Sequence, residues 1–211
     1  YAELTGDSEA KAHVENTLDK ILLGGIYDHV GGGFFRYSTD NKWKVPHFEK
    51  MLYDNAQAIE LYSKAFKVFK KPEYKNAVVQ TIEFLEREMK NAEGGYYSAL
   101  DSQSEGKDGK FYVWKEEELK SVLKDDFELF ASYYNIVPEA VWEDDNFVLH
   151  KLLDDKAFLE KKSLQTSELV AVKKRWKEKL LSARGNRISP RSDDKILTSW
   201  NALLIKGFIA S

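Results

Sequence analysis

Apolar residues recur at intervals of three and four along most of the chain, the spacing that places them on one face of a helix. This pattern predicts helices over residues 8–22, 48–71, 73–92, 116–123, 126–134 and 167–183, and a last helix from about 194 onward. Asp7 suits the N-cap of the first helix, and Pro46 suits the first turn of the second. Residues 135–165 show no clear period, so the chain is predicted to be nearly all-α with one irregular stretch.

Three loops interrupt these helices. Gly24 and Gly25 introduce a loop over 26–46, with an expected hairpin whose arms are 34–37 and 43–45, and Gly94 and Gly95 introduce a similar loop over 96–114, strand-like at 111–114. Gly185 precedes a third loop over 186–193. Because one helical hairpin separates the first two loops, both should emerge at the same end of the molecule. The third loop should join them if the helices between 116 and 134 lead away and helix 167–183 returns.

Composition excludes several classes of function. The chain of 211 residues has a formal net charge of −3 and a pI near 5.9, which argues against a nucleic-acid partner. The basic residues between 173 and 179 alternate with apolar ones and indicate a solvated helix face. The absence of cysteine excludes disulfides and thiolate chemistry in this chain. No apolar run has the length of a membrane span and no signal peptide opens the sequence, so we expect no membrane partner and a cytoplasmic location.

Three long motifs resemble one family. They read GGIYDHVGGGFFRYSTDNKWKVPHFEKMLYDNA at 24–56, SALDSQSEGKDGKFYVW at 98–114 and RSDDKILTSWNALLI at 191–205. In this order they closely resemble the thioredoxin-domain-containing family typified by spermatogenesis-associated protein 20. The resemblance implies helical hairpins forming part of an (α/α)6 toroid, similar to six-hairpin glycosidases and N-acylglucosamine 2-epimerases, with small β-hairpins in the loops.

The resemblance also implies an arrangement of domains. Residues 1–211 would be a single fragment, roughly the first half of the toroid, and its partners would be the missing C-terminal half and the thioredoxin-like domain that precedes the toroid in the family. The start at Tyr1 and the end at Ser211, after an uncapped apolar helix, fit that expectation. In the second loop, Leu100 and Gln103 stand where the family usually has acidic residues, whereas Asp101 and Glu105 are retained.

Four residues are candidates for catalysis, because proton transfer near neutral pH needs a histidine or a carboxyl group with a tuned pKa. They are His47, Asp101, Glu105 and Asp194. His47 lies at an expected helix start, where the helix dipole would keep it neutral, but a capping or packing role fits equally. Carboxylates facing each other across a mouth suit glycoside hydrolysis, whereas an epimerase needs two proton-transfer groups on opposite faces of a sugar. Either Asp193 or Asp194 suits a helix N-cap instead.

Aromatic rings with polar tips crowd the first two loops and suit a sugar-binding cleft. The candidates for substrate binding are Tyr27, His29, Arg36, Trp43, Tyr97, Asp193 and Trp200. His29 precedes three glycines, which allow either a close ligand or a tight turn. Arg36 suits an anionic substrate group or a pair with a nearby acid. Lys50 and Asp54 are predicted to pair across one helical turn, and no motif calls for a cofactor or a metal.

Two functions of different classes remain open. The leading hypothesis is a toroid that binds or acts on a carbohydrate-like molecule, as a hydrolase or an epimerase, at a mouth lined by the three loops. The alternative is a non-catalytic scaffold that presents clients to a thioredoxin-like domain. The last helix is apolar on nearly every side, so we also expect self-association through it and no activity of this chain alone.

Overall fold

Helices dominate the computed structural model, which describes residues 2–211 and leaves Tyr1 outside the described part. The helices are α1 (Ala2–Thr5), α2 (Ser8–Leu23), α3 (Leu52–Phe69), α4 (Pro72–Phe84), α5 (Glu116–Leu123), α6 (Phe127–Tyr133), α7 (Asp155–Lys162), α8 (Thr166–Arg184) and α9 (Thr198–Ala210). A π-helical turn, η1 (Leu85–Met89), continues α4, and three short 3-10 turns follow as η2 (Lys124–Asp126), η3 (Pro138–Ala140) and η4 (Glu143–Asp145). The prediction of an all-α chain is confirmed.

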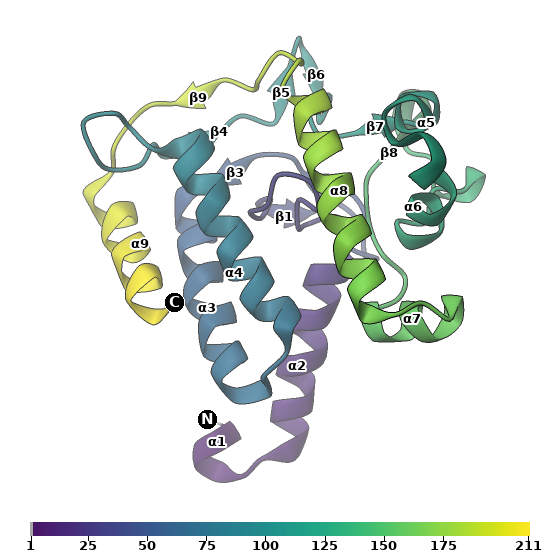
Figure 1. Cartoon of the computed structure of the whole chain (residues 1–211). Coiled ribbons are helices and arrows are strands. Elements are labelled where there is room, and N and C mark those ends of the chain that lie inside the picture. Colours follow the sequence, from purple (N-terminus) through teal and green to yellow (C-terminus); the bar gives the residue numbers. More distant parts are fainter. Residues whose placement is uncertain (1) are drawn as a thin grey trace.

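The strands are two residues long and belong to the loops. Three antiparallel pairs form small hairpins or bridges: β1 (Tyr37–Ser38) with β2 (Pro46–His47), β5 (Gln103–Ser104) with β6 (Lys107–Asp108), and β7 (Trp114–Lys115) with β8 (Asn146–Phe147). A three-stranded antiparallel sheet has the order β3 (Lys50–Met51), β4 (Ala99–Leu100), β9 (Ser192–Asp193). Strands β4, β5, β6 and β9 lie at the top of the view in Figure 1, at one end of the helices.

Helical hairpins build the body of the molecule. Helix α3 runs away from the strand end and α4 returns beside it, while α9 packs along α3 in the same direction as α3 (Figure 1). Gly207 permits this approach, since a Cβ there would lie 2.7 Å from the carbonyl oxygen of Ala56. No helix of the described chain is long and apolar enough to cross a membrane.

Two apolar clusters form most of the core. The first joins α2, α3, α4 and α9 and includes the fully buried Ile59, Tyr62 and Tyr74. The second joins α5, α6, α7 and α8 around Trp176. The helical stripes of the sequence are therefore the faces that these clusters bury, as amphipathic helices require.

Several predicted boundaries were wrong. Pro46 lies in strand β2, and α3 begins only at Leu52, because the preceding residues pair with the loops instead of with helical neighbours. The last helix begins at Thr198, so neither Asp193 nor Asp194 is its N-cap, a place that Leu197 takes without a side-chain bond. The N-cap at Asp7 is confirmed by its bond from the backbone nitrogen of Ala10 at 2.9 Å.

Candidate functional site

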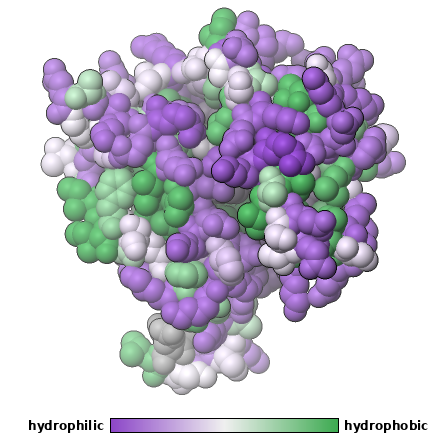
Figure 2. Space-filling model, in the orientation of Figure 1, coloured by the Kyte–Doolittle hydropathy of each residue, from purple (hydrophilic) through white to green (hydrophobic). Residues whose placement is uncertain are grey.

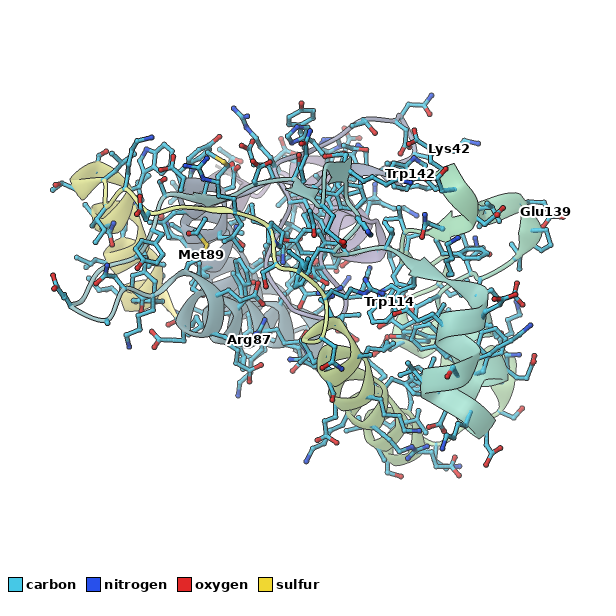
Figure 3. All side chains as sticks on the ribbon, turned by 90° about the horizontal axis from the view of Figure 1, so that it is seen from above. Lys42, Arg87, Met89, Trp114, Glu139 and Trp142 are labelled. Atoms are coloured by element: carbon cyan, nitrogen blue, oxygen red, sulfur yellow. The ribbon has the colours of Figure 1, made fainter. Side chains whose placement is uncertain are left out.

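The segment after the first loop meets the second and third loops in the sheet β3–β4–β9. Met51, from the segment between the first loop and α3, pairs with Ala99 of the second loop, which in turn pairs with Asp193 of the third. The backbone nitrogen of Asp101 also donates to the carbonyl oxygen of Arg191 at 2.9 Å. The predicted convergence is confirmed for the second and third loops, which meet the segment that follows the first loop, and we call this end of the molecule the mouth. Figure 3 looks down on it and shows the segment of β9 crossing from α8 to α9.

A group of polar side chains surrounds the start of α3. Nη1 of Arg36 donates to Oε2 of Glu49 at 3.0 Å, and Nδ1 of His47 lies 3.8 Å from the same oxygen. The ring of His47 stacks on Tyr37, with 5.0 Å between centroids. Nδ1 of His47 is buried and has no hydrogen-bond partner. Strand pairing of β1 with β2 produces this arrangement, because Tyr37 is directly opposite His47.

The first turn of α3 adds Tyr53 and Asp54 to this group. The ring of Tyr53 meets Trp200 of α9 edge to face at 4.8 Å. Oδ2 of Asp54 is buried without a hydrogen-bond partner. Burial raises the pKa of Asp54 to about 6, although the charge of Arg36 and a hydrogen bond with Tyr53 act to lower it. We call Arg36, His47, Glu49, Tyr53 and Asp54 the mouth cluster.

Beneath the mouth lies a buried ion group formed by Asp28, Lys50 and Arg184. Oδ2 of Asp28 accepts from Nζ of Lys50 at 2.8 Å and from Nη1 of Arg184 at 2.7 Å. Burial by itself would raise the pKa of Asp28, but the charges of Arg184 and Lys50 hold it well below its usual range. The predicted pairing of Lys50 with Asp54 is wrong, because Lys50 belongs to β3 and points into the core instead of along α3.

Two predicted binding residues of the first loop contact other parts of the protein instead of the mouth cluster. Tyr27 is 8% exposed, and its hydroxyl donates to Oε1 of Gln80 at 2.8 Å. Nε2 of His29 lies 2.9 Å from the carbonyl oxygen of Gly24, and its ring contacts those of Tyr27 and Tyr134. Burial lowers the pKa of His29 to about 3, so this ring stays neutral. In this structure both residues support the loop.

The predicted carboxylates of the second and third loops lie at the surface, and two of the four form ion pairs. Glu105 forms an ion pair with Lys110 at 2.7 Å, and Asp193 pairs with Lys195 at 3.1 Å. Oδ1 of Asp101 accepts from the backbone nitrogen of Gln103 at 3.1 Å. Asp194 is exposed at the end of β9. The structure therefore does not gather these four carboxylates around His47.

Trp43 and Tyr97 occupy supporting positions as well. Trp43 adopts a left-handed backbone, with φ of 58°, and its carbonyl oxygen accepts from Gly25 at 2.8 Å. The hydroxyl of Tyr97 accepts from Nδ2 of Asn91 at 3.2 Å. Of the predicted site residues, the structure thus brings together His47, Arg36 and Trp200 at the start of α3.

Two surface hollows lie away from this cluster. One, of about 550 Å³, is lined by Lys107, Lys110, Trp142 and the acidic turn η4, and Trp142 is labelled in Figure 3. The other, of about 510 Å³, lies between α6 and the start of η3 and reaches Lys162. Among the described residues, no group of three or more histidines and acids could hold a metal ion.

Sequence reasoning missed Glu49 and Asp54 as members of the site. Glu49 was expected inside a helix, where it would have no reason to face His47, and Asp54 was assigned to Lys50. The signal that could have found them is the alternation of apolar Pro46 and Phe48 with polar His47 and Glu49, which has the period of a strand.

Comparison with known proteins finds relatives that match nearly the whole of this chain. Spermatogenesis-associated protein 20 is 32% identical in Homo sapiens and 33% identical in Mus musculus, over 97% of this chain and 29% of each relative. An uncharacterised protein of Caenorhabditis elegans is 33% identical over 93% of this chain and 30% of its own length. The chain therefore spans about 30% of the length of these curated relatives. No protein-family model matches it.

Two solved structures resemble the chain weakly. A D-mannose isomerase is 21% identical with a TM-score of 0.37, over 65% of this chain and 37% of that one. A family 76 glycoside hydrolase from a bovine Bacteroides thetaiotaomicron strain is 11% identical with a TM-score of 0.43, over 99% of this chain and 39% of that one. Similarity at this level carries no conclusion about activity.

Proposed function

From the geometry of the mouth we propose that the chain binds a carbohydrate-like molecule against the mouth cluster. The chain is homologous over nearly its whole length to spermatogenesis-associated protein 20, but that name specifies no reaction. The observation that carries this proposal is the pair of buried, unpartnered polar atoms, Nδ1 of His47 and Oδ2 of Asp54, beside the contact of Tyr53 with Trp200. Buried polar atoms are normally hydrogen-bonded, so such atoms at a loop-lined end suit a polar ligand.

The chemistry of the cluster fits sugar hydroxyls. Arg36 offers several donors, Glu49 offers acceptors, and both are only partly buried, with 43% and 26% of their side chains exposed. Tyr53 and Trp200 add apolar ring surface of the kind that packs against the carbon face of a sugar. Hydrolysis and epimerisation both require proton transfer, for which His47 and Asp54 are the titratable groups nearest the start of α3.

A scaffold function is the second candidate, and one observation favours it. Helix α9 exposes Ile205 at 60% and Ile209 at 81%, and Figure 2 shows a hydrophobic area at the place of α9 in Figure 1. An exposed apolar area of this kind suits a protein partner. The ion pairs of Glu105 and Asp193 also fit a mouth whose carboxylates serve structure.

Ligand titration followed by NMR tests the proposal. The chain, labelled with ¹⁵N, is titrated with glucose, mannose, N-acetylglucosamine and cellobiose at millimolar concentrations, and the indole signal of Trp200 and the backbone signals of 36–54 are recorded. At least one sugar should shift these signals with saturation. Glu49→Gln should weaken that binding by about tenfold, since it replaces a charged acceptor with a neutral one.

The matched control is Glu117→Gln, which makes the same chemical change on the exposed face of α5. Its affinity for the sugar should equal that of the unmodified chain. Shifts that spread over the surface without saturation, or an equal loss in both variants, would contradict sugar binding at the mouth cluster. If the chain binds none of the four sugars, the scaffold function is the better supported of the two hypotheses.

A further inference from the structure

Asp54 differs from the other carboxylates at the mouth in its surroundings. Glu49, Glu105 and Asp193 each lie within 3.1 Å of the cationic nitrogen of an arginine or a lysine. Asp54 has no ion pair among those of the described chain, and one of its oxygens is buried without a donor. The side chain as a whole is half-buried, at the surface of the first turn of α3. Asp101 and Asp194 also lack an ion pair within the described part of the chain, but both are exposed to solvent, so Asp54 is the carboxyl group of this end that is half-buried without a paired cation.

Asp54 lies in the first turn of α3, where a carboxylate is normally stabilised. The dipole of α3 favours a carboxylate in the first turn, and Arg36 adds a positive charge on the same side. Burial nevertheless outweighs both, and the pKa of Asp54 rises to about 6. The charged and titratable groups that face it are Arg36 and Glu49 from the segment before α3, and Tyr53 from α3 itself.

From this arrangement we infer that Asp54 is the proton donor of the mouth, and that its carboxyl group in the neutral form gives a hydrogen bond, and then its proton, to an oxygen of the bound sugar. The inference rests on the proposed function. As the C–O bond of the sugar breaks, its electron pair stays on that oxygen, the proton of Asp54 converts the oxygen into a hydroxyl, and water supplies the new bond to carbon. The Asp54 carboxylate left behind is stabilised by Arg36 and regains a proton from solvent.

Glu49 completes the assignment as the carboxylate that is paired with a cation. It is held by Arg36 at 3.0 Å and faces Nδ1 of His47 at 3.8 Å. Two carboxyl groups five residues apart in the chain thus have opposite surroundings, one paired with a cation and one desolvated. Such a division separates the acid from the base or electrostatic partner in enzymes that use two carboxyl groups.

The pH dependence of sugar affinity tests the inference separately from the proposed function. A neutral donor binds the sugar only while it keeps its proton, so affinity should be constant at low pH and fall about tenfold per pH unit above the pKa of Asp54 in the free chain, which is about 6. The Asp54→Asn variant also donates but cannot titrate, so its affinity should lose the part of the pH dependence that Asp54 causes. The Asp125→Asn variant, on an exposed turn, should keep the pH dependence of the unmodified chain.

A direct measurement keeps the inference testable even if Asp54→Asn folds poorly. The carboxyl carbon of Asp54 in the ¹³C-aspartate-labelled chain should titrate near pH 6, and the sugar that binds should raise that midpoint. Either of two results would overturn the role of Asp54 and leave sugar binding intact: an affinity for the sugar that is the same at every pH, or a titration midpoint of the Asp54 carboxyl signal that the sugar does not change. If glucose, mannose, N-acetylglucosamine and cellobiose all fail to bind, the proposed function falls and the donor role falls with it.

Discussion

The buried ion group beneath the mouth gives the sharpest prediction on stability. Asp28 comes from the first loop, Lys50 from β3 and Arg184 from the end of α8, so one carboxylate joins three distant segments. Their side chains are 3%, 0% and 4% exposed, respectively. Asp28→Asn keeps the shape of the side chain but removes the charge, and its amide NH₂ would face the donors of Lys50 or Arg184.

The size of the effect follows from this burial. Breaking a buried ion pair by removing one partner costs about 3–5 kcal/mol, because the remaining charge is left uncompensated in a dry environment. For a chain of this size, each kcal/mol lowers Tm by about 2–4 °C, so Asp28→Asn should melt about 6–20 °C below the unmodified chain. The bonds from the backbone nitrogens of Val30 and Gly31 to Oδ1 survive in the amide and keep the loss from being larger.

Thermal and urea unfolding followed by circular dichroism measure this loss. Asp144→Asn is the matched control, since it makes the same change in an ion pair whose two side chains are each 64% exposed, and exposed pairs contribute little. The double variant Asp28→Asn with Lys50→Met should be more stable than the sum of the two single losses predicts, because it removes one of the stranded cations. The reasoning is refuted if Asp28→Asn and Asp144→Asn melt together.

The same group has a pH dependence of known sign. The folded pKa of Asp28 lies below that of an unfolded aspartate, so its contribution is fully present above about pH 4 and is lost as the pH falls further. The difference in stability between the unmodified chain and Asp28→Asn should therefore shrink in acid. A difference that grows below about pH 4 would contradict the assignment of a charged Asp28.

Three further predictions concern the first loop and α9. Gly33→Ala should lower the urea midpoint more than Gly94→Ala, because a Cβ at Gly33 would lie 2.5 Å from Cδ1 of Phe84, whereas Gly94 has no neighbour within 4 Å and shares only the positive φ. The pKa of His29 is about 3 in the folded chain, so only the unfolded chain takes up a proton at this residue between about pH 7 and about pH 5. The unmodified chain should therefore lose more stability over this range than His29→Gln, and equal slopes of the urea midpoint against pH would argue against this reasoning. Ile205→Lys should weaken the proposed self-association through α9, and unchanged sedimentation at all concentrations would show that α9 is not the contact.

Much of the helical framework was predictable because its signal is local. Helix 116–123 matches α5 residue for residue, and 167–183 differs from α8 by one residue at each end. Periodicity and capping act over a few residues, so Asp7 and Gly185 could be recognised from their neighbours alone. The common end of the second and third loops also followed from the alternating directions of the helices.

The contacts of the site could not be predicted in the same way, because they depend on partners far apart in the chain. Lys50 was assigned to Asp54, four residues away, whereas its true partner Asp28 is twenty-two residues away and Arg184 lies beyond two further loops. The departure at Leu100 illustrates the same limit: its side chain is 5% exposed and joins the first apolar cluster, so a carboxylate there would meet a very different environment from that of Asp101. Sequence identified the residue types, and only the fold separated supporting residues from exposed ones.

The sheet β3–β4–β9 has a consequence for the evolution of such a protein. Its pairings are made by main-chain atoms, and each strand is only two residues long. Backbone bonds are indifferent to side-chain identity, so the neighbouring positions that project from the rim are free to vary while the loops remain in register. An architecture of this kind allows new ligand preferences to arise by single substitutions, with the anchoring of the three segments left untouched.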